Sequence, residues 1–247
     1  VKVVIGANPE ELLDESYDIV IKNPGIKYTN PVVVKADKLG IPVINEVEAA
    51  SYFFPEGLQV IGVTGSNGKT TTTNLINEFL KKAGKKVIMA GNMGIPVCSI
   101  LDKLTSDTIL LLEISIQQLC NMHHFKTNVS VLTNLSPTHI DFLDTYENYM
   151  NTKKRIFNNH TAKDIAILNA ENSDVMTLTK DIVSTKIYFS SKKIADLCIL
   201  DDYIVYKNEK IVKLSDIKLQ GMHNYENIMC AIAASMVYGV SKEAIIS

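Results

Sequence analysis

The sequence lacks the features that mark several large classes of protein. Its 247 residues carry a formal net charge of −2 and hold no block of basic residues, so neither nucleic acid nor an anionic membrane is expected as a partner. No apolar run approaches the roughly 20 residues that a membrane-spanning helix needs. We also find no internal repeat and no low-complexity tract. With 46% hydrophobic and 21% charged residues, the composition is that of an ordinary soluble globular protein.

Cysteine is scarce and scattered. The four cysteines are Cys98, Cys120, Cys198 and Cys230, and no two of them form a CxxC pair. A structural zinc site or a disulfide framework needs closely spaced cysteines or an oxidising compartment. The spacing therefore favours reduced thiols in the core of a cytoplasmic protein.

The most informative stretch is residues 60–72, which reads VIGVTGSNGKTTT. Residues 60–63 predict a buried strand, and a helical pattern begins at Lys69, directly after the glycine-containing turn. This order is typical of the phosphate-binding loop of an NTPase, in which glycines and a helix N-terminus direct N–H groups at phosphate. The predicted nucleotide contacts are Thr64, Gly65, Ser66, Asn67, Gly68, Lys69, Thr70 and Thr71. Lys69 is expected at the β/γ-phosphates and the Thr70 hydroxyl on Mg²⁺.

One position departs from the usual spacing G-x-x-x-x-G-K-[ST], because Val63 stands where the first glycine is expected. The alternative interpretation is a β–α turn that binds nothing. A Gly-Lys-Thr that opens a helix straight after an apolar strand argues against it. We therefore interpret the stretch as a variant loop found in one group of ATP-using enzymes.

Short strands and helices alternate over residues 1–55, which predicts a small parallel β/α unit. The expected strands are residues 2–5, 17–21 and 41–44, and the expected helices are 9–13 and 31–39. Proline and glycine within residues 53–57 predict a domain boundary, so residues 1–55 and 56–247 are expected to form separate domains. Because the chain starts inside an apolar run and ends in what resembles a shortened helix, we interpret it as truncated at both ends.

The second part predicts an α/β domain. Near-continuous apolar strands alternate with amphipathic helices, which indicates a parallel sheet covered on both faces. These strands are expected at 86–90, 108–113, 128–134 and 164–169. Residues 197–213 hold three short strand patterns separated by turn pairs and predict a small antiparallel meander, and a helix is expected at 224–238.

Several polar residues follow predicted strands, at the sheet edge where parallel sheets bind ligands. Glu113 follows a buried strand, as does the Mg²⁺-binding acid beside many phosphate loops, although it could instead cap the next helix. His139 lies in an irregular loop together with Asp141; a metal or phosphate contact is one interpretation and a plain surface histidine the other. Asn92 follows the strand at 86–90.

Lys153 falls on the apolar stripe of a helix predicted at 145–157. Such a lysine either extends its ammonium to solvent or is drawn inward, where burial lowers its pKa. A neutral amine can react with CO₂ to give a carbamate, which binds metal. Asn224 and Asn227 lie one turn apart at a helix start, so that their amides could face an adenine edge, although capping explains Asn224 equally well.

Together these segments resemble the Mur ligases, ATP-dependent amino-acid-adding enzymes of peptidoglycan synthesis, and within them the D-glutamate-adding branch. The resemblance covers essentially the whole chain. Its carriers are residues 22–26 (KNPGI), 64–71 (TGSNGKTT), 91–94 (GNMG), 113–119 (EISIQQL), 134–141, the helix that holds Lys153, and 221–227 (GMHNYEN).

The resemblance implies a ligase that joins D-glutamate to UDP-N-acetylmuramoyl-L-alanine through an acyl phosphate. It further implies ATP and two Mg²⁺ ions, the first on Thr70 and Glu113, the second on His139 and a carbamylated Lys153. Implied substrate contacts are Asn92, Ser115 and His139 for the muramoyl part and Asn23, Pro24 and Gly25 for the uridine diphosphate. A C-terminal domain that supplies most of the D-glutamate site is expected to be missing here, so that the chain alone is expected to be an inactive, monomeric fragment.

One motif departs from the family pattern, which usually reads Glu-x-Ser-Ser-Phe-Gln-Leu. Ile116 and Gln117 replace a serine and a phenylalanine, and a lost hydroxyl is expected to weaken substrate binding. The alternatives are another amide ligase of the superfamily, such as a folylpolyglutamate synthetase or a different Mur ligase, and a paralogue that binds ATP without catalysis.

Overall fold

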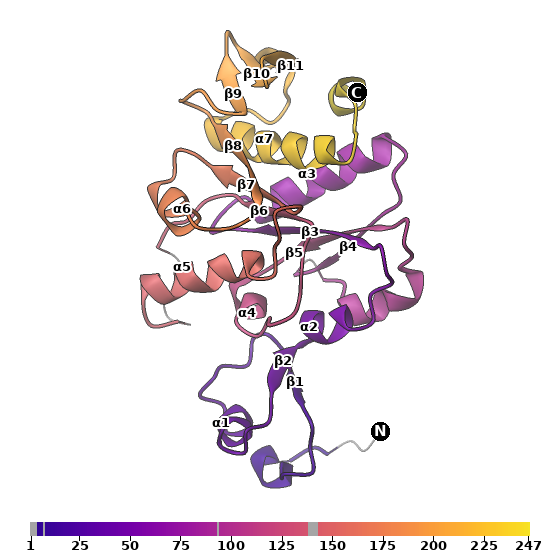
Figure 1. Cartoon of the computed structure of the whole chain (residues 1–247), viewed down its shortest axis with the longest axis vertical. Coiled ribbons are helices and arrows are strands. Elements are labelled where there is room, and N and C mark those ends of the chain that lie inside the picture. Colours follow the sequence, from indigo (N-terminus) through magenta and orange to yellow (C-terminus); the bar gives the residue numbers. More distant parts are fainter. Residues whose placement is uncertain (1–3, 7, 93, 138–142) are drawn as a thin grey trace.

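The computed structural model describes residues 4–6, 8–92, 94–137 and 143–247 (Figure 1). The predicted ligand His139 and its neighbour Asp141 lie outside the described residues. The same holds for residues 2 and 3 of the first predicted strand. The remainder of that strand prediction is wrong, because Val4 and Ile5 are in irregular backbone and Ile5 is 94% exposed.

A nine-stranded sheet forms the main body, in the order β11-β10-β9-β8-β7-β6-β3-β5-β4. Its strands are β3 (Gln59–Thr64), β4 (Val87–Gly91), β5 (Ile109–Glu113), β6 (Val129–Leu132), β7 (Ile165–Asn169), β8 (Thr185–Ser190), β9 (Leu197–Leu200), β10 (Tyr203–Tyr206) and β11 (Glu209–Lys213). Strands β4 to β9 and β3 pair in parallel, which confirms the predicted α/β class. The first strand of this sheet along the chain, β3, lies between β5 and β6, with β4 and β5 on one side of it and β6 to β11 on the other. Its carboxyl end is thus a topological switch point, where such sheets bind ligands.

Helices cover both faces of this sheet (Figure 1). On one face α3 (Lys69–Lys82), α7 (Met222–Val237) and α8 (Lys242–Ile246) pack on one set of strand side chains, among them Ile61 and Leu111. The other face carries α2 (Glu46–Ser51), η2 (Val97–Lys103), α4 (Ile116–Leu119), α5 (Tyr146–Lys154), η4 (Arg155–Phe157) and α6 (Ser173–Leu178). Val60 and Leu110 point to this second face. Successive residues of a strand pack into the cores on opposite faces of the sheet. Residues that point to either face must therefore be apolar, which explains the continuous apolar runs of the sequence.

The antiparallel meander of β9, β10 and β11 is present as predicted, and η5 (Leu214–Asp216) follows it. It is not a separate sheet, because β9 pairs in parallel with β8 and so extends the main sheet. Strand β8 was not predicted. In its sequence, TKIYFS, the buried Ile187 and Phe189 are two residues apart and so point to the same face of the sheet.

A smaller parallel pair, β1 (Val20–Lys22) and β2 (Val43–Asn45), forms a second sheet. It packs with η1 (Pro9–Leu12) and α1 (Pro31–Lys38), which begins with Asn30 as its cap and proline at its first position. Glu48 of α2 joins this region to the main body. Its carboxylate is fully buried and accepts the backbone N–H groups of His123, His124 and Phe125 at 3.0, 2.7 and 2.9 Å.

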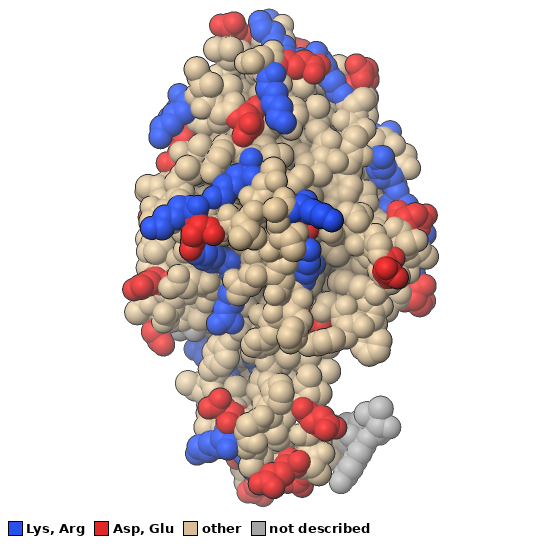
Figure 2. Space-filling view, in the orientation of Figure 1, with Lys and Arg blue, Asp and Glu red and all other residues tan. Residues whose placement is uncertain are grey.

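The surface carries charged side chains of both signs (Figure 2), and most of the cysteines are buried. The face in Figure 2 carries both basic and acidic side chains, without the continuous basic surface that nucleic acid requires. Within the described residues, no helix is both long and apolar enough to cross a bilayer. All four cysteines are free, and three are buried as predicted, whereas Cys98 is exposed.

Candidate functional site

The predicted phosphate loop connects β3 to α3 at the switch point of the sheet. Gly65 and Gly68 both have positive φ, 146° and 83°. A Cβ on Gly65 would lie 2.0 Å from Thr133 Oγ1, and one on Gly68 would lie 2.1 Å from Asn227 Oδ1. Both positions therefore require glycine for two reasons: the backbone has a positive φ, and a side chain would collide with a neighbouring residue.

The end of β6 holds this loop from the neighbouring strand. Asn134 accepts the Ser66 N–H at its backbone oxygen (2.9 Å) and the Asn67 N–H at its Oδ1 (3.0 Å). Thr133 Oγ1 donates to the Asn67 carbonyl at 2.6 Å. Sequence reasoning placed Asn134 only within a motif and gave Thr133 no role. Their position at a strand end, one strand from the loop, was the signal that could have found them.

Lys69 lies over its own loop. Its ammonium donates to the carbonyls of Gly65 and Ser66 at 3.0 and 2.9 Å. Burial lowers the pKa of Lys69, and the negative charge of Glu113 opposes that shift. The cation is therefore held beside the loop by carbonyl dipoles.

Glu113 lies beside the loop as predicted and is 2% exposed. Its Oε2 accepts the Thr70 hydroxyl and its Oε1 accepts the Asn92 amide, both at 2.7 Å. The capping alternative for Glu113 is wrong, because Ser115 caps α4 in a reciprocal pair with Gln118. Three of the predicted site residues thus form one hydrogen-bonded group: Asn92 directly after β4, Glu113 at the end of β5 and Thr70 at the start of α3.

Lys153 is drawn inward, so the alternative of an ammonium extended to solvent is wrong. Its side chain is 2% exposed, and Nζ donates to Thr64 Oγ1 at 2.9 Å and lies 5.6 Å from the Tyr149 ring centroid. Burial, and after it the positive charge of Lys69, lowers the pKa of Lys153 to about 7. Near neutral pH a large share of this amine is unprotonated and nucleophilic.

The two asparagines at the start of α7 differ in their surroundings. Asn227 is buried, lies against Gly68 and accepts from Thr72 Oγ1 at 3.4 Å. Asn224 donates instead to the Gln220 carbonyl at 2.8 Å and so does not cap α7 with its oxygen, which overturns the capping alternative. The structure therefore brings Asn227 to the loop and leaves Asn224 one turn further out.

The remaining predicted contacts lie apart from the loop or serve the local fold. The Asn23–Gly25 turn is closed by a bond from Gly25 N to Asn23 Oδ1 at 3.0 Å, beyond the end of β1. Ile116, the residue that departs from the family motif, is 3% exposed and packs in the core. Its replacement of a serine therefore changes core packing rather than an exposed hydroxyl.

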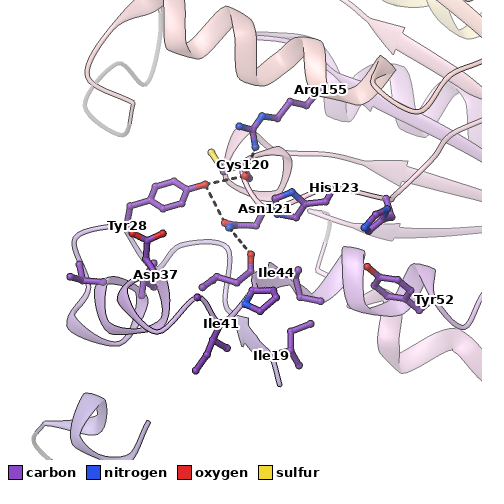
Figure 3. A pocket seen from close by; sticks show the side chains of 16 residues that line it. Ile19, Tyr28, Asp37, Ile41, Ile44, Tyr52, Cys120, Asn121, His123 and Arg155 are labelled. Atoms are coloured by element: carbon purple, nitrogen blue, oxygen red, sulfur yellow. Dashed lines mark hydrogen bonds between the residues drawn. The ribbon is translucent and has the colours of Figure 1, made fainter. Parts of the chain in front are cut away.

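Figure 3 shows a hollow of about 830 Å³ between the small sheet and the main body, away from the phosphate loop. The Cys120 carbonyl there accepts both Tyr28 OH, at 3.0 Å, and Arg155 Nη1, at 2.6 Å. Asn121 Nδ2 donates to the Val43 carbonyl at 3.1 Å. Among the described residues, no predicted site residue lines this hollow, which is therefore distinct from the phosphate loop.

The donors around Glu113 suit Mg²⁺. A hydroxyl and a carboxylate are hard oxygen ligands, and this ion usually takes one or two protein ligands with phosphate oxygens and water. In the part of the chain that the structure describes, no three His, Cys, Asp or Glu side chains gather into a metal cluster. The group fits an ion shared with a nucleotide better than a caged structural metal.

Curated relatives share about two fifths of their residues with this chain. UDP-N-acetylmuramoylalanine--D-glutamate ligase of Geobacillus kaustophilus is 42% identical over 247 residues, and the enzyme of the same name from Streptococcus uberis is 41% identical over 246. Each comparison covers 99% of this chain and 54% of the relative. The chain thus spans about half the length of these relatives.

Solved structures and a family model agree on the fold. A ligase from Neisseria meningitides, which its title describes as UDP-N-acetylmuramate:L-alanyl-gamma-D-glutamyl-meso-diaminopimelate ligase, superposes with a TM-score of 0.66 at 19% identity over 96% of this chain and 79% of its own. UDP-N-acetylmuramate-alanine ligase from Thermotoga maritima gives 0.61 at 20% identity over 93% and 53%. Residues 63–235, which include the phosphate loop, Glu113 and Lys153, match the model of the Mur ligase middle domain. The chain therefore belongs to the Mur ligase family.

Proposed function

We propose that the complete protein is an ATP-dependent ligase that joins D-glutamate to UDP-N-acetylmuramoyl-L-alanine. The observation that carries this proposal is the group formed by Thr70, Glu113 and Asn92 beside the phosphate loop. It unites a nucleotide loop, a carboxylate for Mg²⁺ and an amide for the acceptor at one sheet edge. The choice of acceptor and amino acid is supported by the names of the relatives at 41–42% identity.

In this proposal the phosphate loop and Lys69 hold the triphosphate, and Thr70 and Glu113 hold Mg²⁺. Bound there, the ion neutralises charge on the phosphoryl oxygens. Asn227, supported by its contact with the loop, faces the adenine, and we assign Asn224 to the same base. Asn92, Ser115 and the Asn23–Gly25 turn bind the muramoyl and uridine diphosphate ends of the acceptor.

We assign Lys153 to a second Mg²⁺ as a carbamate, together with His139. The support is chemical: carbamate formation needs an unprotonated amine, and the pKa of Lys153 is lowered to about 7 by burial. A peptide of 44 Da added mass at Lys153, formed in bicarbonate, tests this assignment independently of activity.

The proposed reaction has two balanced steps. An oxygen of the alanyl carboxylate attacks the γ-phosphorus of ATP, and the bond to ADP breaks, which gives an acyl phosphate. The amine of D-glutamate then attacks the acyl carbon, and phosphate leaves with the carboxylate oxygen while the amine loses a proton. The chain's own contribution is to orient the reactants and to compensate charge. The proposal further places the enzyme in the cytoplasm as a monomer, with residues 1–55 and 56–247 as separate domains.

The test is substrate dependence. The complete gene product is assayed for phosphate release with ATP and Mg²⁺, and one substrate is omitted at a time. We expect release only when UDP-N-acetylmuramoyl-L-alanine and D-glutamate are both present. Release that depends on a folate and L-glutamate, or on a different muramoyl acceptor, would assign another ligase activity. ATP binding without release under any combination would indicate a non-catalytic paralogue.

A further inference from the structure

Two hydroxyl groups at the end of β3 join the phosphate loop to helix α5. Thr64 is the last residue of β3, and Ser66 lies two residues further on, in the phosphate loop; the hydroxyls of both contact side chains of α5. Tyr149 and Lys153 are four residues apart and therefore share one face of α5. Thr64 Oγ1 lies 2.9 Å from Lys153 Nζ, and Ser66 Oγ lies 2.8 Å from Tyr149 OH.

The Thr64 bond has a defined direction. Its hydroxyl proton is directed to the Ile114 carbonyl at 2.8 Å, which leaves the oxygen to accept from Lys153. Thr64 is fully buried and Lys153 is 2% exposed, so water does not replace the bond readily. A buried amine without an acceptor carries a desolvation cost, which makes the hydroxyl important for keeping Lys153 in place.

The Ser66 bond links a third segment. Ser66 Oγ accepts the Ser136 N–H at 2.9 Å and is 3.1 Å from the Ser136 carbonyl, toward which it donates its single proton. Tyr149 OH is then the donor to Ser66. Ser136 precedes His139 by three residues, so one serine hydroxyl connects the phosphate loop, α5 and the strand–loop segment that leads to His139.

We propose that Thr64 and Ser66 are positioning residues, whose hydroxyls hold Lys153 and α5 at a fixed place relative to the phosphate loop. This role is additional to the loop's contacts with nucleotide. It rests on the proposed function only in that Lys153 acts in the reaction. The geometric part of the claim stands independently of which acceptor is used.

The first test measures how Lys153 is held and needs no substrate. The complete gene product is acetylated with an N-hydroxysuccinimide ester, and the rates at Lys153 and at its neighbour Lys154 are compared by peptide mass spectrometry. We expect Thr64→Val to raise the rate at Lys153 about tenfold, because loss of one buried hydrogen bond favours local opening. Thr64→Ser keeps the hydroxyl and should label as wild type.

The matched control is Thr179→Val, the same change at a buried threonine of the α6 end whose hydroxyl bonds the Val175 carbonyl. It should leave the labelling of Lys153 unchanged. If Thr64→Val labels as slowly as wild type, or if Thr179→Val has the same effect as Thr64→Val, the positioning role is overturned. Because no turnover is involved, this result is separate from success or failure of the ligase assay.

The second test separates positioning from nucleotide binding. We expect Thr64→Val to lower kcat about tenfold with the KM for ATP within about threefold, and Thr64→Ser to restore kcat. For Ser66→Ala and Tyr149→Phe, the double variant should be no worse than the poorer single variant, since Ser66→Ala already removes the bond between the two hydroxyls that Tyr149→Phe removes. A raised KM for ATP with unchanged kcat, or additive effects of Ser66→Ala and Tyr149→Phe, would contradict the proposal.

Discussion

Gly68 and Gly84 share a left-handed backbone but differ in their surroundings. Their φ angles are 83° and 71°, yet a Cβ on Gly84 meets nothing within 4 Å, while one on Gly68 would meet Asn227 at 2.1 Å. We expect Gly84→Ala to destabilise the protein by about 1 kcal/mol through backbone strain alone. Gly68→Ala should cost more and lower ATP affinity at least about tenfold, because Asn227 or the loop must move.

Isothermal titration with ADP and Mg²⁺, together with urea unfolding, measures both effects. The two glycines serve as controls for each other, since the conformational penalty is common and only the contact differs. Equal losses of stability and unchanged nucleotide affinity in both variants would contradict the role of Gly68 in the site.

At Glu113 the charge can be removed while the shape is kept. In Glu113→Gln the side chain still reaches Thr70 and Asn92, but it offers Mg²⁺ a neutral amide in place of a carboxylate. We expect kcat to fall about a hundredfold, in the range found when one electrostatic contact of a transition state is lost. Glu78→Gln on the exposed side of α3 should have wild-type kinetics. A Glu113→Gln enzyme with normal kcat would remove this carboxylate from the reaction.

The residues of the loop could be predicted because phosphate binding requires their spacing. Glu113 could be predicted because it comes directly after a buried strand. The interactions that no local pattern encodes were missed. Tyr149 was interpreted only as part of an apolar stripe, although its hydroxyl contacts Ser66, and Thr133 was assigned no role, although it borders Gly65. These two contacts join residues 83 and 68 positions apart in the chain, so they depend on the order of the strands in the sheet.

At the scale of elements, α2 is fastened to the segment after α4 by one buried carboxylate. Glu48 accepts three backbone N–H groups of residues 123–125. In Glu48→Gln the amide NH₂ would face these donors, so we expect a loss of about 2 to 3 kcal/mol in the free energy of unfolding. Urea unfolding measures it, and the exposed Glu56→Gln is the control. A Glu48→Gln protein as stable as Glu56→Gln would show that the carboxylate does not support this junction.

Element prediction succeeded where the apolar pattern was continuous and failed at its margins. The strands β3 to β7 and the helix α7 were found within one to three residues at each end, because both of their faces are buried. The segment 185–190 was missed because its alternation is short and lacks turn signals on both sides. The hydrophobic residues 4 and 5 suggested a strand, but hydrophobicity alone does not provide the neighbouring strand that a sheet position requires.

At the scale of the whole molecule, stability should depend on pH through His160. It is buried, with Nε2 near Thr127 and Ser130 at 2.8 and 3.0 Å and Nδ1 2.7 Å from Ser184. Burial lowers the pKa of His160 to about 4, and the nearby Asp164 opposes this shift while Lys126 adds to it. Between pH 6.5 and 4 the unfolded chain therefore binds more protons than the folded one at this site, and stability falls as the pH falls.

We expect this histidine to contribute about 2 kcal/mol of the stability lost over that range. His160→Gln retains polar contacts but does not titrate, so its unfolding free energy should depend less steeply on pH. Unfolding in urea at pH 7, 6, 5 and 4 measures the two slopes. Identical slopes in wild type and variant would contradict the assignment.

The sheet order itself explains why the separate sequence signals meet. Because β3 lies between β5 and β6, Thr64, Glu113 and the segment after β6 end side by side, although they are about 50 and 70 residues apart in the chain. The parallel sheet and its ligand edge could be predicted from strand patterns. The order of the strands could not be predicted from these patterns, because the pairing of strands depends on which helices cover which face of the sheet.

Phosphoryl transfer from ATP to the acceptor carboxylate at this sheet edge can be followed by the transfer of an oxygen isotope. The complete gene product is given UDP-N-acetylmuramoyl-L-alanine labelled with oxygen-18 in the alanyl carboxylate, with ATP, Mg²⁺ and D-glutamate, and the released phosphate is analysed by mass spectrometry. Because the acceptor oxygen that attacks phosphorus leaves with the phosphate, we expect each phosphate formed from fully labelled acceptor to carry one labelled oxygen. Unlabelled phosphate, released while the amide product forms, would contradict this phosphoryl transfer.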